Sequence, residues 1–328
     1  MVGLFKQKSS VNSLFVLFYG LVLKFPLFLR PPGGPLRQAE DHFLYNWLAD
    51  VITPWHIPPV VYSIITFLLL YSQAMLVNRI FVVQRMLGNP NYLPAMAYML
   101  ITSLFPEWNQ FSAPLLVNSF LIVIFYRLVN IHNAARAGAA IFNVGLLMGI
   151  VTLLYEPAVL FVLLVLFALF IMRPIRLREW LISLLGVTMP YYFLGILLYL
   201  TNQWDWKKLQ PDITLTFPAM PTDILVTISL SLLILPFIVG GFMVNANLSK
   251  MFIHVRKAWS LLLLFLIISV FIILATGHAG YTSWFLCVVP LTGFHAAAYY
   301  FPSRGLFPPI MHWLLFFFAI YINYMPGH

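Results

Sequence analysis

Apolar residues fall along this chain in long runs, and the short segments between the runs carry almost all of the charged residues. A helix needs about 20 mostly apolar residues to cross the hydrocarbon core of a bilayer. Eleven runs approach this length, and they predict membrane spans at 12–30, 57–78, 92–105, 112–131, 137–154, 157–173, 179–200, 223–245, 258–276, 283–301 and 307–325. The third run is short, so we expect it to be tilted, paired with a neighbour or partly re-entrant.

The composition agrees with this pattern. Hydrophobic residues make up 62% of the 328 residues and charged residues only 8%, whereas a soluble domain carries about 25% charged residues. So few charges could not cover the core of a soluble fold, which also excludes a disordered chain and a coiled coil. The predicted fold class is an all-α, polytopic membrane protein with one integral domain over residues 1–328. The single cysteine, Cys287, allows no internal disulfide and no thiolate metal cluster.

The basic residues predict how the spans are oriented. With the N-terminus in the cytoplasm and the spans alternating, 13 of the 18 Lys and Arg residues lie at cytoplasmic ends: Lys6, Lys8, Arg79, Arg85, Arg127, Arg136, Arg173, Arg176, Arg178, Lys250, Arg256, Lys257 and Arg304. This distribution follows the positive-inside rule, so the net charge of +9 requires no nucleic acid as a partner. The C-terminus is then extracytoplasmic. The run 12–30 lacks a small-residue cleavage site and is expected to stay as the first helix.

The acidic residues gather on the opposite side. Eight of the nine carboxylates are predicted to be extracytoplasmic: Glu40, Asp41, Asp50, Glu107, Glu156, Asp205, Asp212 and Asp223. The positive-inside rule does not require this, because acidic residues contribute little to orientation. One explanation is an acid–base or metal site on that face, and the other is that excluding basic residues leaves acids as the only charges there. Two segments on that side, 31–56 and 201–222, are long enough to hold structure of their own.

The first of these segments begins with Pro and Gly residues at 31–35, which break the first helix. Residues 38–51 then show helical spacing, with an apolar face typical of a helix lying in the membrane interface. Glu40 and Asp41 fall in the first predicted turn, where the helix dipole favours negative charge. Ordinary helix capping is therefore an alternative to a functional role for this acidic pair.

An acidic residue just after the first helix, followed within one turn by an aromatic residue, resembles the GT-C glycosyltransferases. In this chain Glu40 and Asp41 are followed by Phe43 and Tyr45, and Glu107 lies in the next external loop. The resemblance covers roughly residues 1–131, and it implies a GT-C-like arrangement of helices and a polyprenyl-phosphate-linked sugar donor. The chain departs from most members in being shorter and in lacking a large external C-terminal domain.

The resemblance implies roles for the acids. Asp41 is the expected catalytic base that takes the proton of a hydroxyl acceptor, and Glu40 and Glu107 are expected supporting acids. The three together are also candidate ligands for a divalent metal such as Mg or Mn, because hard cations take carboxylate oxygens.

Further residues are candidates for binding the substrate. Arg37, Lys207 and Lys208 could hold the phosphate of the donor, and plain interface anchoring is their alternative role. Tyr45 is the aromatic residue of the acidic motif, and His278 lies in a tight external turn whose ordinary turn chemistry is the alternative.

Three other features leave alternatives open. Lys24 lies within the first helix and either extends outward to the interface or faces the bundle interior. Glu156, before Pro157, is either an acid flanking a helix start or a third acid of the external site. Trp204 and Trp206 fit an aromatic belt at the membrane surface or a platform for a sugar.

The whole chain also resembles an uncharacterised family of polytopic inner-membrane proteins of Bacteroidota. The segments that carry this resemblance are Gly3-Leu4-Phe5-Lys6, Tyr19-Gly20, Lys24-Phe25-Pro26 and Arg178-Glu179-Trp180, with Gly186 and Pro190. It implies a location in the bacterial inner membrane and no particular chemistry.

Two other classes of function remain open. A transporter or flippase of a lipid-linked or small envelope substrate is favoured by helix breakers inside predicted spans, such as Pro190, Pro236 and Pro290. The spans lack carboxylates at mid-membrane depth for ion coupling, which disfavours it. A non-catalytic subunit of an envelope complex is the third class. The sequence gives neither the acceptor nor the oligomeric state.

Overall fold

The computed structural model describes residues 2–7, 9, 11–131, 137–210, 223–276, 280–302 and 305–325. The regular structure in these ranges is helical, apart from isolated bridge residues, and Asp41 and Tyr155 form one antiparallel bridge. The α-helices are α1 (Val2–Phe5), α2 (Val11–Lys24), α3 (Pro26–Leu29), α4 (Phe43–Ile52), α5 (Pro59–Val83), α6 (Leu93–Ile101), α7 (Ala113–Asn130), α8 (Ala137–Leu154), α9 (Phe161–Met172), α10 (Leu177–Leu200), α11 (Ile224–Asn247), α12 (Ile253–Ala275), α13 (Val288–Tyr300) and α14 (Phe307–Tyr324). Short 3-10 turns η1 (Thr53–Trp55), η2 (Pro106–Asn109), η4 (Glu156–Leu160), η5 (Trp206–Lys208), η6 (Leu248–Lys250) and η7 (Ser283–Cys287) lie at or between their ends.

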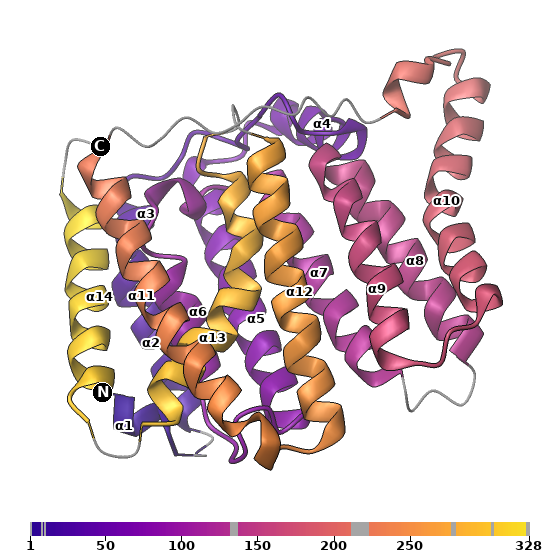
Figure 1. Cartoon of the computed structure of the whole chain (residues 1–328). Coiled ribbons are helices and arrows are strands. Elements are labelled where there is room, and N and C mark those ends of the chain that lie inside the picture. The colour runs from indigo at the N-terminus through magenta and orange to yellow at the C-terminus, as the bar shows by residue number, and fades with distance from the viewer. Residues whose placement is uncertain are drawn as a thin grey trace.

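The long helices stand side by side, with α1 and the last turn of α14 at opposite ends of the bundle (Figure 1). We call the end that holds α1 and the turns at Arg85, Arg173 and Lys250 the basic face. The end that holds Asp41, Glu107 and Glu156 is the acidic face. The separation of charge that the sequence predicts is thus present in the fold.

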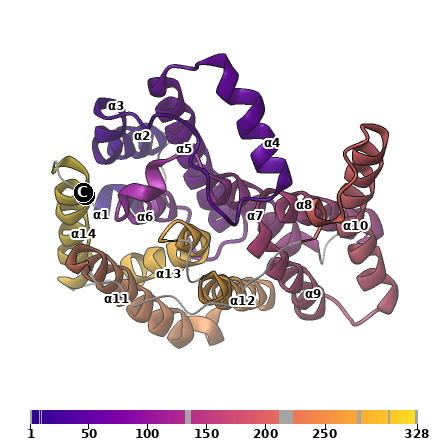
Figure 2. The same ribbon diagram turned by 90° about the horizontal axis from the view of Figure 1, so that it is seen from above.

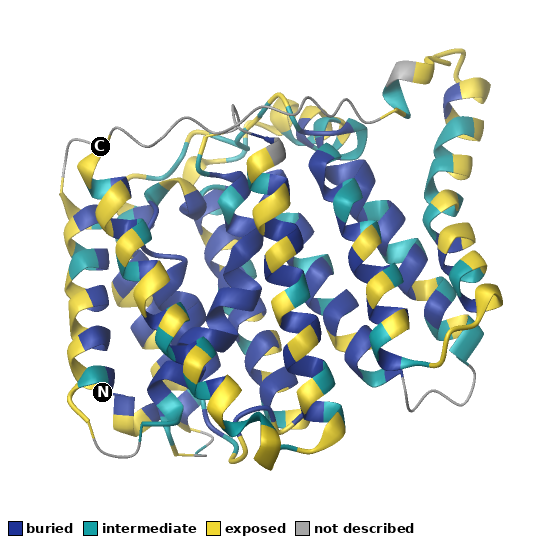
Figure 3. Cartoon of the chain, viewed as in Figure 1, coloured by how far each residue is buried: buried dark blue, intermediate teal, exposed yellow. Residues whose placement is uncertain are grey.

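Seven helices in the described residues are long and apolar enough to cross a bilayer: α5, α7, α8, α10, α11 with η6, α12 and α14. Many large apolar side chains on their outer surfaces are exposed, and Phe193, Phe242 and Phe317 are each more than half exposed. Figure 3 shows exposed residues along the outer helices. These features indicate a multi-pass membrane protein, as predicted. The other four predicted spans form shorter helices, so a total of eleven crossings stays a prediction.

Two of the short helices lie in the middle of the bundle. All nine residues of α6 are buried, and so are twelve of the thirteen residues of α13. Figure 2 shows these two helices surrounded by α2, α5, α11, α12 and α14. A helix enclosed by protein need not match the thickness of the bilayer, which explains why the third apolar run is short.

The end of α6 is buried, and polar side chains from two other helices satisfy it. Lys24 at the end of α2 is 1% exposed, and its ammonium donates to the carbonyl of Thr102 at 3.0 Å and to the side chain of Asn109. Asn323 of α14 donates to the carbonyl of Ser103 at 2.6 Å. The last carbonyls of a helix lack partners within the helix, so Lys24 faces the interior as a cap rather than the interface.

Helix α10 packs mainly on α8 through glycines. A β-carbon added at Gly145 would collide with the carbonyl oxygen of Ser183, and one added at Gly149 with that of Val187. A β-carbon on Gly186 of α10 would likewise meet the carbonyl oxygen of Phe142. Small residues let helix backbones approach closely inside a membrane, so these positions require glycine.

Lys24→Met should lower the free energy of unfolding by about 1–3 kcal/mol, because it leaves the carbonyl of Thr102 buried without a partner. Lys250→Met is the matched control: Lys250 is exposed, and surface changes usually stay within about 0.5 kcal/mol. Denaturant titration in detergent micelles would measure both variants. Equal stability of the two would show that Lys24 does not hold the end of α6.

Labelling of single cysteines should show the acidic and basic faces on opposite sides of the membrane. In a Cys287→Ala background, Glu40→Cys should react with a membrane-impermeant thiol reagent in intact cells. Arg176→Cys should react only after the cells are permeabilised. Labelling of both positions from one side would contradict the predicted topology.

Candidate functional site

The segment that links α3 to α4 is anchored on the acidic face by backbone contacts. The Leu36 N–H donates to the carbonyl of Phe111 at 2.8 Å. The Tyr45 hydroxyl donates to the carbonyls of Leu36 at 2.8 Å and Phe111 at 3.1 Å. The side chain of Tyr45 is wholly buried, so it fixes this segment in place, and a contact of Tyr45 with the substrate stays a prediction.

Helix α4 begins later than the sequence predicts. The predicted helix covered 38–51, whereas α4 is Phe43–Ile52, and no side chain caps its first turn. Glu40 and Asp41 therefore precede the helix. The carboxylate of Asp41 accepts a hydrogen bond from the Gln38 N–H at 2.7 Å, so capping of α4 does not explain it. Trp47 and Val51 form an exposed apolar face on α4, in agreement with an interfacial helix.

The backbone around Glu40 and Asp41 forms hydrogen bonds with the end of α8. Asp41 and Tyr155 form the isolated bridge, in which the His42 N–H donates to the carbonyl of Leu154 at 3.2 Å and the Glu156 N–H to that of Glu40 at 3.1 Å. These groups are free to pair because α8 ends at Leu154 and the chain turns at once into η4. The bridge brings Glu40, Asp41 and Glu156 together, and we call these three residues the carboxylate cluster.

Asp41 is the buried member of the cluster. It is 4% exposed, and its Oδ1 atom has no hydrogen-bond partner among the described residues. Burial raises its pKa to about 7, with further upward contributions from the charges of Glu40 and Glu156. The Gln38 hydrogen bond and the Arg37 charge oppose the shift. A carboxyl group that titrates near neutral pH can both accept and release a proton there.

Sequence reasoning missed the contribution of His42. Its side chain is buried, and burial lowers its pKa below the usual value. A neutral imidazole supplies no positive charge to compensate Asp41. Nothing in the sequence distinguishes this histidine from an exposed one, because its burial depends on contact with the end of α8.

Glu107 lies apart from the carboxylate cluster. It is an exposed residue of η2, in contact with the backbone of Tyr281, and the next residue, Trp108, donates to the Tyr281 carbonyl at 2.8 Å. The charges that act on Asp41 are those of Glu40, Arg37 and Glu156. The third acid that acts on Asp41 in the structure is Glu156, beside the bridge, and a supporting role for Glu107 stays a prediction.

The placement of the acidic side chains does not support the predicted metal site. Among the residues that the structure describes, no group of three His, Cys, Asp or Glu side chains is placed to hold a metal ion. Glu40, Asp41 and Glu107 thus do not form a shared site for Mg or Mn.

The predicted phosphate-binding residues lie in different surroundings. Arg37 forms an ion pair with Asp50 at 2.7 Å, with both side chains about half exposed or more, so it is engaged by α4. Lys208 is partly exposed at the end of η5, on the segment that follows α10. The Lys207 side chain and His278 lie outside the described residues.

An aromatic pocket lies beside the cluster, between the outer half of α10 and the segment that follows it. Its volume is about 760 Å³, and its lining is Tyr191, Tyr192, Gly195, Ile196, Tyr199, Leu200, Trp204, Trp206 and Leu209. Tyr191 links the two sites, because its hydroxyl donates to Thr152 Oγ1 at 2.8 Å and Glu156 acts on it electrostatically. The predicted aromatic belt of Trp204 and Trp206 forms part of this pocket.

Comparison of the chain with protein-family models, with curated proteins and with solved structures finds no match.

The stability of the protein should depend on pH through Asp41. The raised pKa means that burial of the charged form destabilises the fold, so this cost is absent below about pH 4 and fully present above about pH 7. Asp41→Asn keeps the acceptor for Gln38 without the charge. Its stability relative to the wild type should therefore increase between pH 4.5 and 8, by at most about 4 kcal/mol.

Thermal unfolding at pH 4.5, 6 and 8 would measure this difference, and Asp50→Asn controls for the loss of one negative charge at an exposed position. A stability difference that does not change with pH would mean that Asp41 titrates as an ordinary carboxyl group.

Proposed function

We propose that the chain is a membrane enzyme that transfers a sugar or related group from a polyprenyl-phosphate donor to a hydroxyl acceptor at its acidic face. The observation that carries the proposal is the buried carboxyl of Asp41, which has a pKa of about 7 and an Oδ1 atom with no hydrogen-bond partner in the described part of the chain. A general base is most effective when its pKa lies near the working pH. The resemblance of the N-terminal part to GT-C glycosyltransferases points to the same residue.

In the proposed reaction, Asp41 Oδ1 accepts the proton of the acceptor hydroxyl as its oxygen attacks the anomeric carbon. The bond between that carbon and the phosphate oxygen breaks, and the lipid phosphate leaves with the electron pair. Asp41 then releases the proton to water. Glu40 and Glu156 support the base, because their negative charges favour proton uptake by Asp41.

The aromatic pocket supports a lipid-linked donor. Its lining is aromatic and aliphatic, which suits an isoprenoid chain, and it borders the outer half of α10, where exposed residues such as Tyr199 and Leu200 would meet lipid. Lys208 lies on the same segment as Trp206 and is the candidate partner of the phosphate. We place the acidic face outside the cytoplasm of a bacterial inner membrane, following the distribution of basic residues.

The transporter alternative has less support from the fold. Pro190 lies within the continuous helix α10 and Pro236 within the continuous helix α11, so neither residue creates a broken helix of the kind that forms a midplane binding site. Gly186 and Gly240 instead allow close packing against the backbones of α8 and α13.

Asp41→Asn should lower the rate of transfer by about 10²–10⁴-fold, the usual cost of losing a general base. The measurement is transfer of radiolabelled sugar from a polyprenyl-phosphate donor in proteoliposomes, together with complementation of a strain that lacks the gene. Glu156→Gln should have a smaller effect, because Glu156 acts only through its charge on Asp41.

Asp50→Asn serves as the control, since it removes an acid from the same face outside the cluster. If Asp41→Asn and the double variant Glu40→Gln/Asp41→Asn insert into the membrane and complement fully, the enzyme hypothesis must be abandoned.

A further inference from the structure

A pocket of about 370 Å³ opens on the basic face, on the side of the bundle opposite the carboxylate cluster. Its walls come from three turns: the one that follows α5, the one between α11 and α12, and the end of α13. This volume lies within the range of small-molecule sites. The proposed transfer reaction makes no use of it.

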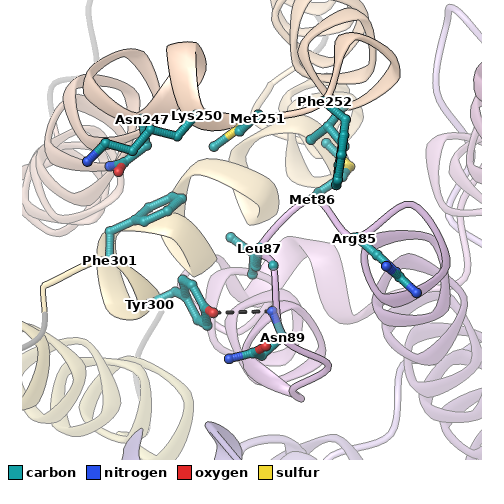
Figure 4. Close-up of a pocket in the computed structure, with 12 residues that line it drawn as sticks. Arg85, Met86, Leu87, Asn89, Asn247, Lys250, Met251, Phe252, Tyr300 and Phe301 are labelled. Carbon is teal, nitrogen blue, oxygen red and sulfur yellow. Dashed lines mark hydrogen bonds between the residues drawn. The ribbon is translucent and has the colours of Figure 1, made fainter.

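The lining of the pocket is amphipathic (Figure 4). The side chains of Met86, Leu87 and Met251 lie in its middle, and polar groups lie at its edges. Asn247 and Lys250 end together on one side. On another side the Tyr300 hydroxyl accepts a hydrogen bond from the Asn89 N–H at 3.2 Å. Several of the other lining residues are apolar. No Asp or Glu residue lines the pocket.

Among the described residues, no acid pairs with the basic side chains at this pocket. The ion pairs among the described residues use only Asp50 and Glu179 as acids, and neither residue lines the pocket. Lys250 therefore presents an uncompensated ammonium group at one edge. Arg85 stands at another edge and extends outward (Figure 4), so its charge adds to the local potential without a direct contact.

The backbone at Arg85 supplies an independent observation. Arg85 has a φ of 53° directly after the end of α5, a position and conformation at which helices usually place glycine. A side chain there strains the backbone, and strain of this kind points to a role for the residue. Here the role that fits is the charge that Arg85 adds beside the pocket.

We propose that this pocket binds an anionic phospholipid, with the phosphate at Lys250 Nζ and the amide of Asn247 and an acyl chain against Phe252 and Phe301. Phe252 is 67% exposed, which an acyl chain would cover. Basic residues at a membrane surface attract anionic headgroups. A soluble phosphate ester shares the phosphate chemistry but leaves the apolar middle of the pocket unfilled, so the lipid is the better match.

The test is lipid binding to the purified full-length protein in detergent, followed by native mass spectrometry. Phosphatidylglycerol should bind in preference to phosphatidylcholine, and glycerol 3-phosphate should not compete at equal concentration. Lys250→Gln should weaken phosphatidylglycerol binding about fivefold, the value of one basic residue at a membrane surface. Arg178→Gln, which removes an exposed charge on the same face outside the pocket, should leave binding unchanged.

Arg85→Gly separates loss of binding from loss of folding. Glycine adopts the left-handed conformation without strain, so this variant should be at least as stable to heat as the wild type while binding phosphatidylglycerol more weakly. Competition by glycerol 3-phosphate would identify a soluble phosphate ligand and overturn the lipid assignment. Unchanged binding by Lys250→Gln, or equal binding of phosphatidylcholine, would overturn the site itself.

Discussion

The fold depends on how a short helix ends inside a membrane bundle. The last carbonyls of α6 are buried within the bundle, since Thr102 and Ser103 are wholly buried, and an unsatisfied carbonyl there is costly. Lys24 from α2 and Asn323 from α14 supply the missing donors. These contacts join the first and last long apolar segments to the centre of the chain, so one requirement for hydrogen bonds organises helices that are distant in sequence.

The acidic face follows from a related constraint on backbone groups. The chain between α3 and α4 is not helical, and three of its backbone groups pair elsewhere. The Leu36 N–H donates to the Phe111 carbonyl, the His42 N–H donates to the Leu154 carbonyl at the end of α8, and the Glu40 carbonyl accepts from the Glu156 N–H. That pairing buries Asp41 beside Glu40 and Glu156, and it leaves one carboxylate oxygen of Asp41 without a hydrogen-bond partner among the described residues. The ability of Asp41 to take up a proton near neutral pH therefore follows from the backbone contacts that hold this irregular segment in place.

Apolar runs and charge distribution predict the helices and the two faces, because both depend on local composition. The burial of Asp41 could not be predicted, because it depends on Tyr155, which lies far away in the sequence. The same is true of Lys24, whose direction the helix pattern leaves open. Glu107 was grouped with Asp41 from its loop alone, but its neighbours are set by the turn at Tyr281, which local pattern does not reveal.

The close glycine contact between α8 and α10 fixes α10 at one point, about which a change in packing would tilt the helix. Gly186 lies at the fulcrum, and Tyr199 of the aromatic pocket lies about 20 Å further along the helix at 1.5 Å per residue. A tilt of about 10° at the contact would move the far end by roughly 3.5 Å over that length. The position of the aromatic pocket relative to the carboxylate cluster therefore depends on the small residues at the contact between α8 and α10.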